Sequence, residues 1–291
     1  MAPLRQTAGP SALKGSKVWP VQAPGSMAEE YASVEKSTAG YAVVTFAREP
    51  ANVMDLGFWQ RLTTILDDVE SDAAVRGVIF HSGLRRNIFT AGNDIKELYA
   101  PKTSRQRYAK FWTLSNHALA RLYSSRLVTV AAVKGACPAG GCCLALCCDV
   151  RLMARDSGYI GLNEVALGIA VPKFWARLMT RLIGQGKADR LMLSAHMPSP
   201  SEALSVGLVD ELVDSSQLMD TAVARMSQML ALPDDGRINT KQSQRSSFSH
   251  EWTECAIQEA QEMFNLLELP STLRGLEAVM QKLAGKKAAK L

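Results

Sequence analysis

The stretch Val133–Asp149, VKGACPAGGCCLALCCD, contains a strand end, a glycine turn and an apolar helix. It continues the apolar run Leu127–Val133, which is typical of a buried strand. Pro138 and the pair Gly140-Gly141 interrupt this run, and Cys142–Cys148 are small enough for a tightly packed helix. Unpaired N–H groups in a first helical turn can stabilise an oxygen that gains negative charge. Glycine pairs are common, however, so this stretch taken alone favours a simple packing turn.

Two further segments extend the pattern. The segment Phe89–Glu97, FTAGNDIKE, follows the predicted strand Val78–Phe80, and Asp94 is placed to begin a helix with an acidic first turn. The segment Ile160–Ile169, IGLNEVALGI, carries one carboxylate, Glu164, among uncharged residues. A surface loop is the ordinary place for an isolated glutamate, so the acid acquires meaning only together with the other two segments.

In order and spacing, FTAGNDIKE, GACPAGGC and GLNEVALGI resemble the crotonase (enoyl-CoA hydratase/isomerase) superfamily, and most closely its mitochondrial-type Δ3,Δ2-enoyl-CoA isomerases. The resemblance extends from about Tyr41 to about Val213, and more weakly to the C-terminus. It implies an α/β fold, a spiral of repeated ββα units with a C-terminal helical region. The alternation of predicted strands and helices over the first 170 residues independently favours a layered α/β core.

Four segments are expected along the chain. Residues 1–40 are rich in Ala, Gly, Pro, Ser and Lys, which predicts a disordered or targeting segment. The remaining segments are an α/β core over 41–213, a C-terminal helical trimerisation region over 214–285 and a basic tail over 286–291. Trimer contacts are implied by the resemblance, whereas periodicity alone is equally consistent with helices that only complete the core.

Local patterns predict several elements within these segments. Amphipathic spacing predicts helices over 216–232 and 251–269, separated by the polar run 233–250. Two short strands are predicted near Val150–Met153 and Tyr159–Gly161.

The resemblance assigns chemistry to particular residues. The backbone N–H groups of Asn93 and Gly140 would bind the thioester oxygen as an enolate forms. The carboxylate of Glu164 would then move a proton between C2 and C4 of a 3-enoyl thioester. An apolar loop disfavours the charged carboxylate, which raises its pKa and its strength as a base. Substrate contacts are expected from Ala91, Gly92, Asn93, Asp94, Ile95 and Gly140.

Departures from the family pattern bear on the reaction. Asn93 replaces the usual Leu or Ala, which keeps the backbone donor and changes the packing near the acyl chain. Cys143 stands where hydratases of this family carry a second glutamate, so one base remains, which favours isomerisation over hydration. Phe174 and Trp175 replace a glycine-rich loop of the hydratases. They would exclude water, although ordinary core aromatics at a helix start are an equally good interpretation.

We therefore expect a Δ3,Δ2-enoyl-CoA isomerase that converts cis or trans 3-enoyl-CoA into trans-2-enoyl-CoA during β-oxidation of unsaturated fatty acids. An acyl-CoA thioester is the expected substrate, the chain is expected to form a homotrimer, and no cofactor is needed because CoA belongs to the substrate. The alternatives are an enoyl-CoA hydratase and a non-catalytic acyl-CoA-binding or RNA-binding member. The missing second glutamate counts against the hydratase, and the retained Glu164 counts against the acyl-CoA-binding protein.

Composition narrows the possible partners. The 291 residues carry a formal net charge of +5, and removing three basic residues from each acid-free end, 1–28 and 284–291, leaves −1. This near-neutral remainder gives no electrostatic footprint for nucleic acid. No apolar run approaches the roughly 20 residues of a membrane helix, so membrane insertion is not expected. The six cysteines and four histidines show no zinc-site spacing, and no metal is expected.

Two terminal patterns suggest different organelles. The last residues, Ala289-Lys290-Leu291, nearly match the peroxisomal address Ser-Lys-Leu. The acid-free, basic segment 1–28 resembles a mitochondrial transit segment, although its prolines and glycines limit helix formation. A three-residue match at the position where it acts is more specific than a compositional bias. We therefore expect a peroxisome-type organelle matrix, with the mitochondrial matrix as the alternative.

Overall fold

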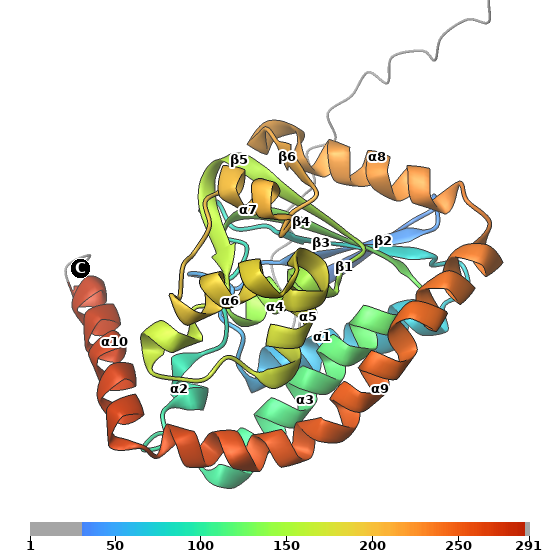
Figure 1. The fold of residues 1–291 in the computed structure, drawn as a ribbon. Coiled ribbons are helices and arrows are strands. Elements are labelled where there is room, and N and C mark those ends of the chain that lie inside the picture. Colours follow the sequence, from blue (N-terminus) through green and yellow to red (C-terminus); the bar gives the residue numbers. More distant parts are fainter. Residues whose placement is uncertain (1–30, 289–291) are drawn as a thin grey trace, which may run out of the picture.

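The computed structural model describes residues 31–288, with side chains as far as Leu283 (Figure 1). Its centre is a six-stranded sheet in which the strands lie in sequence order, with β1 antiparallel to β2 and every later neighbour parallel. Parallel neighbours need long crossovers, and helices supply them here. The strands are β1 Ala32–Ser37, β2 Tyr41–Phe46, β3 Gly77–Ser82, β4 Val128–Pro138, β5 Val150–Gly161 and β6 Glu211–Val213.

The crossover helices follow local sequence signals. Helix α1 (Leu56–Ser71) begins after Asp55, whose carboxylate accepts a hydrogen bond from the Phe58 N–H. Helix α3 (Arg105–Ser124) is capped in the same way by Ser104. Both helices bury an apolar face against the sheet, in agreement with the predicted layered α/β core. The short helices α2 (Ile95–Leu98) and α4 (Gly140–Cys147) complete the crossovers on either side of β4.

Helices cover both faces of the sheet (Figure 1). On one face, α8 (Leu218–Leu230) packs Leu218, Ala222 and Met226 against inward side chains of β3, β4 and β5. On the opposite face lie α1, α3 and α4, and α9 (Asp234–Leu267) runs along α3. The remaining elements connect these layers or follow them: η1 Glu164–Leu167, α5 Lys173–Ile183, α6 Gln185–Leu193, α7 Pro200–Val206, η2 Ser215–Gln217 and α10 Pro270–Ala288.

The pairing of strand β4 with β5 is irregular shortly before the turn that leads into α4. The β4–β5 register shifts between Val133 and Gly135, and Gly135 has a φ of 74°. A Cβ at Gly135 would lie 1.8 Å from the Asn87 carbonyl oxygen, so glycine is required here. Beyond this irregularity β5 continues without a break. The two short strands predicted near Val150–Met153 and Tyr159–Gly161 are therefore one strand.

The predicted interruption at 233–250 is wrong, because α9 is one helix of 34 residues. The polar side chains of this run bind the core instead of forming a loop. Lys241 Nζ donates to the Leu127 carbonyl and pairs with Asp149 at 2.9 Å. Gln242 donates to the carbonyl of Ser124 at the end of α3. These partners are distant in sequence. The polar residues therefore predicted a loop when considered only with their sequence neighbours.

The predicted end segments also need correction. Residues 32–37, expected within a disordered segment, form β1, because Ala32 is buried and Lys36 pairs with Asp68 and Asp72 of α1 and its C-cap. Helix α10 continues to Ala288 and so includes the start of the predicted basic tail. Residues 1–30 and 289–291, which contain both predicted address signals, lie outside the described residues. Within 31–288, no helix is long and apolar enough to cross a membrane.

Candidate active site

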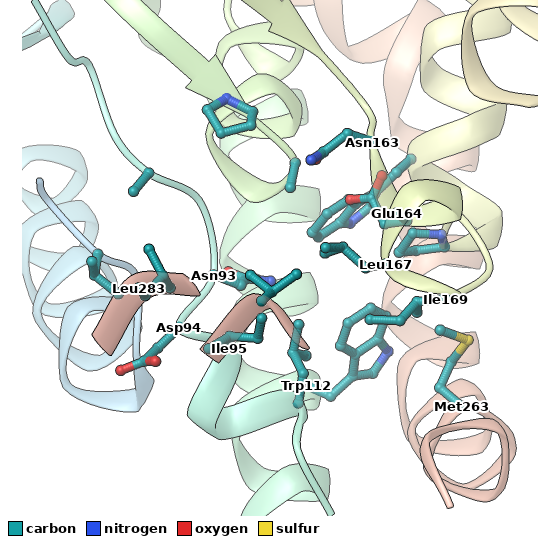
Figure 2. Close-up of a pocket in the computed structure, with 18 of the residues that line it drawn as sticks. Asn93, Asp94, Ile95, Trp112, Asn163, Glu164, Leu167, Ile169, Met263 and Leu283 are labelled. Atoms are coloured by element: carbon teal, nitrogen blue, oxygen red, sulfur yellow. The ribbon is translucent and has the colours of Figure 1, made fainter. Parts of the chain in front are cut away.

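A cavity of about 420 Å³ brings the three sequence segments together (Figure 2). Glu164 lines it from η1, Asn93 from the loop before α2, and Ala139 from the turn between β4 and α4. Of the other predicted contact residues, Ala91, Asp94 and Ile95 also line the cavity. Gly92 and Gly140 are not among the lining residues, but each is the chain neighbour of one. The loop and the turn touch there, since a Cβ on Gly92 would lie 3.1 Å from the Pro138 carbonyl oxygen.

Glu164 is a buried and unpaired acid. The residue is 6% exposed, and neither carboxylate oxygen has a hydrogen-bond partner within the described residues. Burial raises the pKa of the Glu164 carboxyl to about 7, because a carboxylate removed from water is disfavoured. Its predicted apolar shield is only partly the observed one: Leu162 is buried and Leu167 lines the cavity, whereas Val165 is 41% exposed.

Two backbone N–H groups belong to the loop and the turn that border the cavity. Gly140 is the first residue of α4, so its N–H has no acceptor within the helix. It follows Ala139, whose φ of 50° and ψ of −120° make an abrupt turn into the helix. Around Asn93, the Gly92 carbonyl accepts from Met54 and the Asp94 N–H donates to Met54. Met54 and Asn93 thus form an isolated parallel bridge, and the N–H of Asn93 points away from Met54.

The side chain of Asn93 accepts a hydrogen bond from a buried tryptophan. Its Oδ1 accepts a hydrogen bond of 3.3 Å from Nε1 of the buried Trp59. The same oxygen lies 2.8 Å from the position of a Cβ on Gly140. The polar replacement for the usual Leu or Ala is thus satisfied by an indole, and it leaves the backbone N–H of Asn93 in place.

Asp94 has a structural position at this site. Its Oδ1 accepts a hydrogen bond from the Lys96 N–H and so caps α2, as expected for a helix start. Figure 2 shows the Asp94 carboxylate directed away from Glu164. Among described residues that line the cavity, these two carry the carboxylates, and one of them faces the interior.

The sequence profile of the enoyl-CoA hydratase/isomerase family matches residues 36–282. The chain belongs to this family. It is 36% identical over 250 residues to mouse mitochondrial enoyl-CoA delta isomerase 1, covering 86% of each protein. The crystal structure of human mitochondrial Δ3-Δ2-enoyl-CoA isomerase matches with a TM-score of 0.84 and 35% identity, covering 88% of this chain and 99% of that one. These matches confirm the crotonase resemblance and its α/β fold.

The same family also contains hydratases. The short-chain-enoyl-CoA hydratase of Clostridium acetobutylicum is 35% identical over 182 residues, covering 62% of this chain and 68% of that protein. In the present chain, Cys143 is fully buried in α4 and does not line the cavity. Burial also raises the pKa of its thiol, which keeps the sulfur protonated and unreactive. No acidic side chain therefore stands at that position beside Glu164.

The apolar wall of the cavity contains residues that the sequence motifs did not indicate. Tyr108 stacks on Trp112 with ring centroids 5.7 Å apart, and Trp112 stacks on Trp175 at 5.9 Å. The four-residue spacing of Tyr108 and Trp112 on one face of α3 is a signal that could have identified this wall. Further apolar lining comes from Leu98, Ile169, Met263, Val279 and Leu283.

The two interpretations of Phe174 and Trp175 apply to different residues. Trp175 lines the cavity and donates from Nε1 to Asn116, so its ring is fixed at the wall. Phe174 stacks on Trp252 of α9 at 5.8 Å and is a core aromatic. One bulky side chain of the pair thus occupies the wall of the cavity that Glu164 faces, where a ring can exclude water.

Proposed function

We propose that this chain is a Δ3,Δ2-enoyl-CoA isomerase acting on unsaturated fatty acyl-CoA in β-oxidation. The observation that carries the proposal is the buried, unpaired carboxylate of Glu164, which faces a cavity lined by Asn93 and by Ala139, the residue before Gly140. One base is sufficient to move a proton between two carbons of the same substrate. Hydration needs a second acid to orient water, and the family resemblance implies that Cys143 stands at the position of that acid. The names of the matching isomerases support the same conclusion.

The proposed reaction proceeds through a thioester enolate. Glu164 takes a proton from C2 of a cis or trans 3-enoyl-CoA, and the electron pair of that C–H bond delocalises onto the thioester oxygen. The N–H groups of Asn93 and Gly140 donate to this oxygen as its negative charge grows. The Glu164 carboxyl then returns the proton to C4 as the C2–C3 double bond forms. Atoms balance without a cofactor, and the thioester would lie along Ala91, Gly92, Asn93, Asp94, Ile95 and Gly140.

Two substrates test the proposal directly. With a 3-enoyl-CoA, we expect the ultraviolet absorbance of a conjugated 2-enoyl thioester to appear. With a trans-2-enoyl-CoA, we expect no loss of that absorbance through water addition. Hydration of the second substrate at a rate similar to isomerisation of the first would instead identify a hydratase. Binding of both substrates without turnover would identify a non-catalytic acyl-CoA-binding protein.

The raised pKa of Glu164 predicts the pH dependence of isomerisation. The carboxylate form is the base, and burial raises the pKa to about 7. We expect kcat/KM to fall about tenfold per pH unit well below this pKa and to level off above it, since kcat/KM reports groups of the free enzyme. The measurement is kcat/KM in buffers spanning both sides of neutrality. A profile that is flat down to the ordinary glutamate pKa would contradict a buried Glu164 base.

The assembly and the organelle are further parts of this proposal. We propose a homotrimer in which exposed apolar side chains such as Leu193, Leu204 and Leu232 are covered. Light scattering that gives a monomer would contradict it.

The matching isomerases are named mitochondrial, which supports mitochondrial import over the peroxisomal destination suggested by Ala289–Leu291. Imaging should show mislocalisation after deletion of residues 1–28 and an unchanged location after deletion of 289–291. Relocation by the second deletion would restore the peroxisomal assignment.

A further inference from the structure

Helix α10 contacts the helical turn that carries Glu164. The hydroxyl of Thr272, which is 2% exposed, donates a hydrogen bond of 2.9 Å to the Gly168 carbonyl. Gly168 caps η1 with a φ of 71° and donates its own N–H to the Val165 carbonyl. Thr272 thus holds the backbone at the end of the turn that begins with Glu164.

A second contact lies one helical turn further along α10. A Cβ on Gly275 would lie 2.9 Å from the carbonyl oxygen of Leu167, so glycine allows the two backbones to approach closely. The next residue, Leu276, is fully buried and anchors this face of α10 in the core. The spacing of Thr272, Gly275 and Leu276 places all three on one helix face.

No side chain fixes the Glu164 carboxylate itself. Both of its oxygens lack a hydrogen-bond partner in the described part of the chain, so its direction depends on the backbone of η1. We propose that Thr272 is a positioning residue, which holds the Glu164 turn against the cavity together with the close approach at Gly275. This inference rests on the proposed isomerase function, because it assigns Glu164 as the base.

The same helix also closes part of the cavity. Val279 and Leu283, further along α10, line the same cavity as Glu164 and Leu167 of η1. Figure 1 shows α10 beyond the end of α9, at the edge of the molecule near α2. One element therefore supports both the turn that carries the base and the surface that an acyl chain would contact. Movement of α10 would misplace the base and admit water at once.

Three variants separate positioning from general stability. Thr272→Val removes the hydroxyl with little change in shape, Thr272→Ser keeps it, and Ser271→Ala removes an exposed hydroxyl from the same turn. We expect Thr272→Val to lower kcat about tenfold with little change in KM, because small displacements of a reacting group slow the chemical step. Thr272→Ser and Ser271→Ala should both remain near the wild-type kcat.

The pH profile supplies a readout that a purely structural role would not change. If the turn loosens, water reaches Glu164, and the apparent pKa in the Thr272→Val profile should shift downward from the wild-type value. Gly275→Ala should lower kcat and shift the profile in the same direction, and it replaces Thr272→Val if that variant does not fold. A wild-type kcat and pH profile in folded Thr272→Val or Gly275→Ala would overturn the inference. Absence of isomerisation by the wild-type protein would instead refute the proposed function.

Discussion

Glu164→Gln is expected to lower isomerase turnover by about 10²–10⁴-fold, the range associated with loss of a general acid–base group. The substitution preserves the shape of the side chain and removes its ability to accept a proton from carbon. No other carboxylate among the described cavity residues faces the same interior, so no neighbouring base replaces it. The measurement is kcat for a 3-enoyl-CoA, with acyl-CoA affinity determined separately. Retention of more than about a tenth of wild-type turnover would exclude Glu164 as the base.

The stability of this variant supplies an internal control. Because the folded-state pKa of Glu164 is raised to about 7, the folded protein holds a proton over a pH range in which the unfolded chain has lost it. Wild-type stability therefore decreases as pH rises from the ordinary glutamate pKa through about 7. Glu164→Gln should melt at a higher temperature than the wild type above this range, with a smaller gain in acid. Glu262→Gln, on the exposed face of α9, should change neither turnover nor this pH dependence.

Gly140→Ala is expected to reduce kcat by about 10–100-fold, somewhat less than the loss of a complete oxyanion donor. The proposed donors are backbone N–H groups, so side-chain deletion would not remove them. A new Cβ at residue 140 would instead lie 2.8 Å from Asn93 Oδ1 and push the two donor segments apart. The Trp59 hydrogen bond to that oxygen limits how far the Asn93 side chain can move away. The measurement is kcat, with KM for the same substrate as the comparison.

The double variant Asn93→Ala/Gly140→Ala tests this explanation. Shortening residue 93 removes the atom that the new Cβ would meet and leaves both backbone N–H groups. We expect it to recover most of the activity lost in Gly140→Ala, while Asn93→Ala alone stays within a few-fold of the wild type. If Gly140→Ala is as active as the wild type, the N–H of residue 140 does not stabilise the reacting oxygen. A double variant as slow as Gly140→Ala would show that the clash is not the cause.

The site was largely predictable where its chemistry is local in sequence. Glycines at the turns, Asp94 at a helix start and Glu164 in an uncharged loop each mark a backbone or charge requirement within a few residues. Tertiary packing decided the rest. The cavity that Glu164 faces is also lined by Trp175 and Leu167, and its apolar wall includes residues of α3, α9 and α10 that meet only after folding.

The fold shows the same division between local and distant causes. Apolar runs correctly predicted β3 and β4. The starts of α1 and α3 follow the capping residues Asp55 and Ser104, which are local signals. The polar run 233–250 was misinterpreted, because its Lys241 and Gln242 bind carbonyl groups more than 100 residues earlier in the sequence. Edge strand β1 was missed because one of its six residues is buried, so it lacks the apolar run that marks β3 and β4.

Helix α4 has no face in contact with water, since every residue from Gly140 to Cys147 is buried. Dissolved ions screen the field of a surface helix, but they cannot approach the flanks of a helix enclosed on all sides. The partial positive charge at its first N–H is therefore set by the fold and not by ionic strength. If this N–H stabilises the thioester oxygen as proposed, kcat should depend much less on salt concentration than the exposed ion pairs of the surface do.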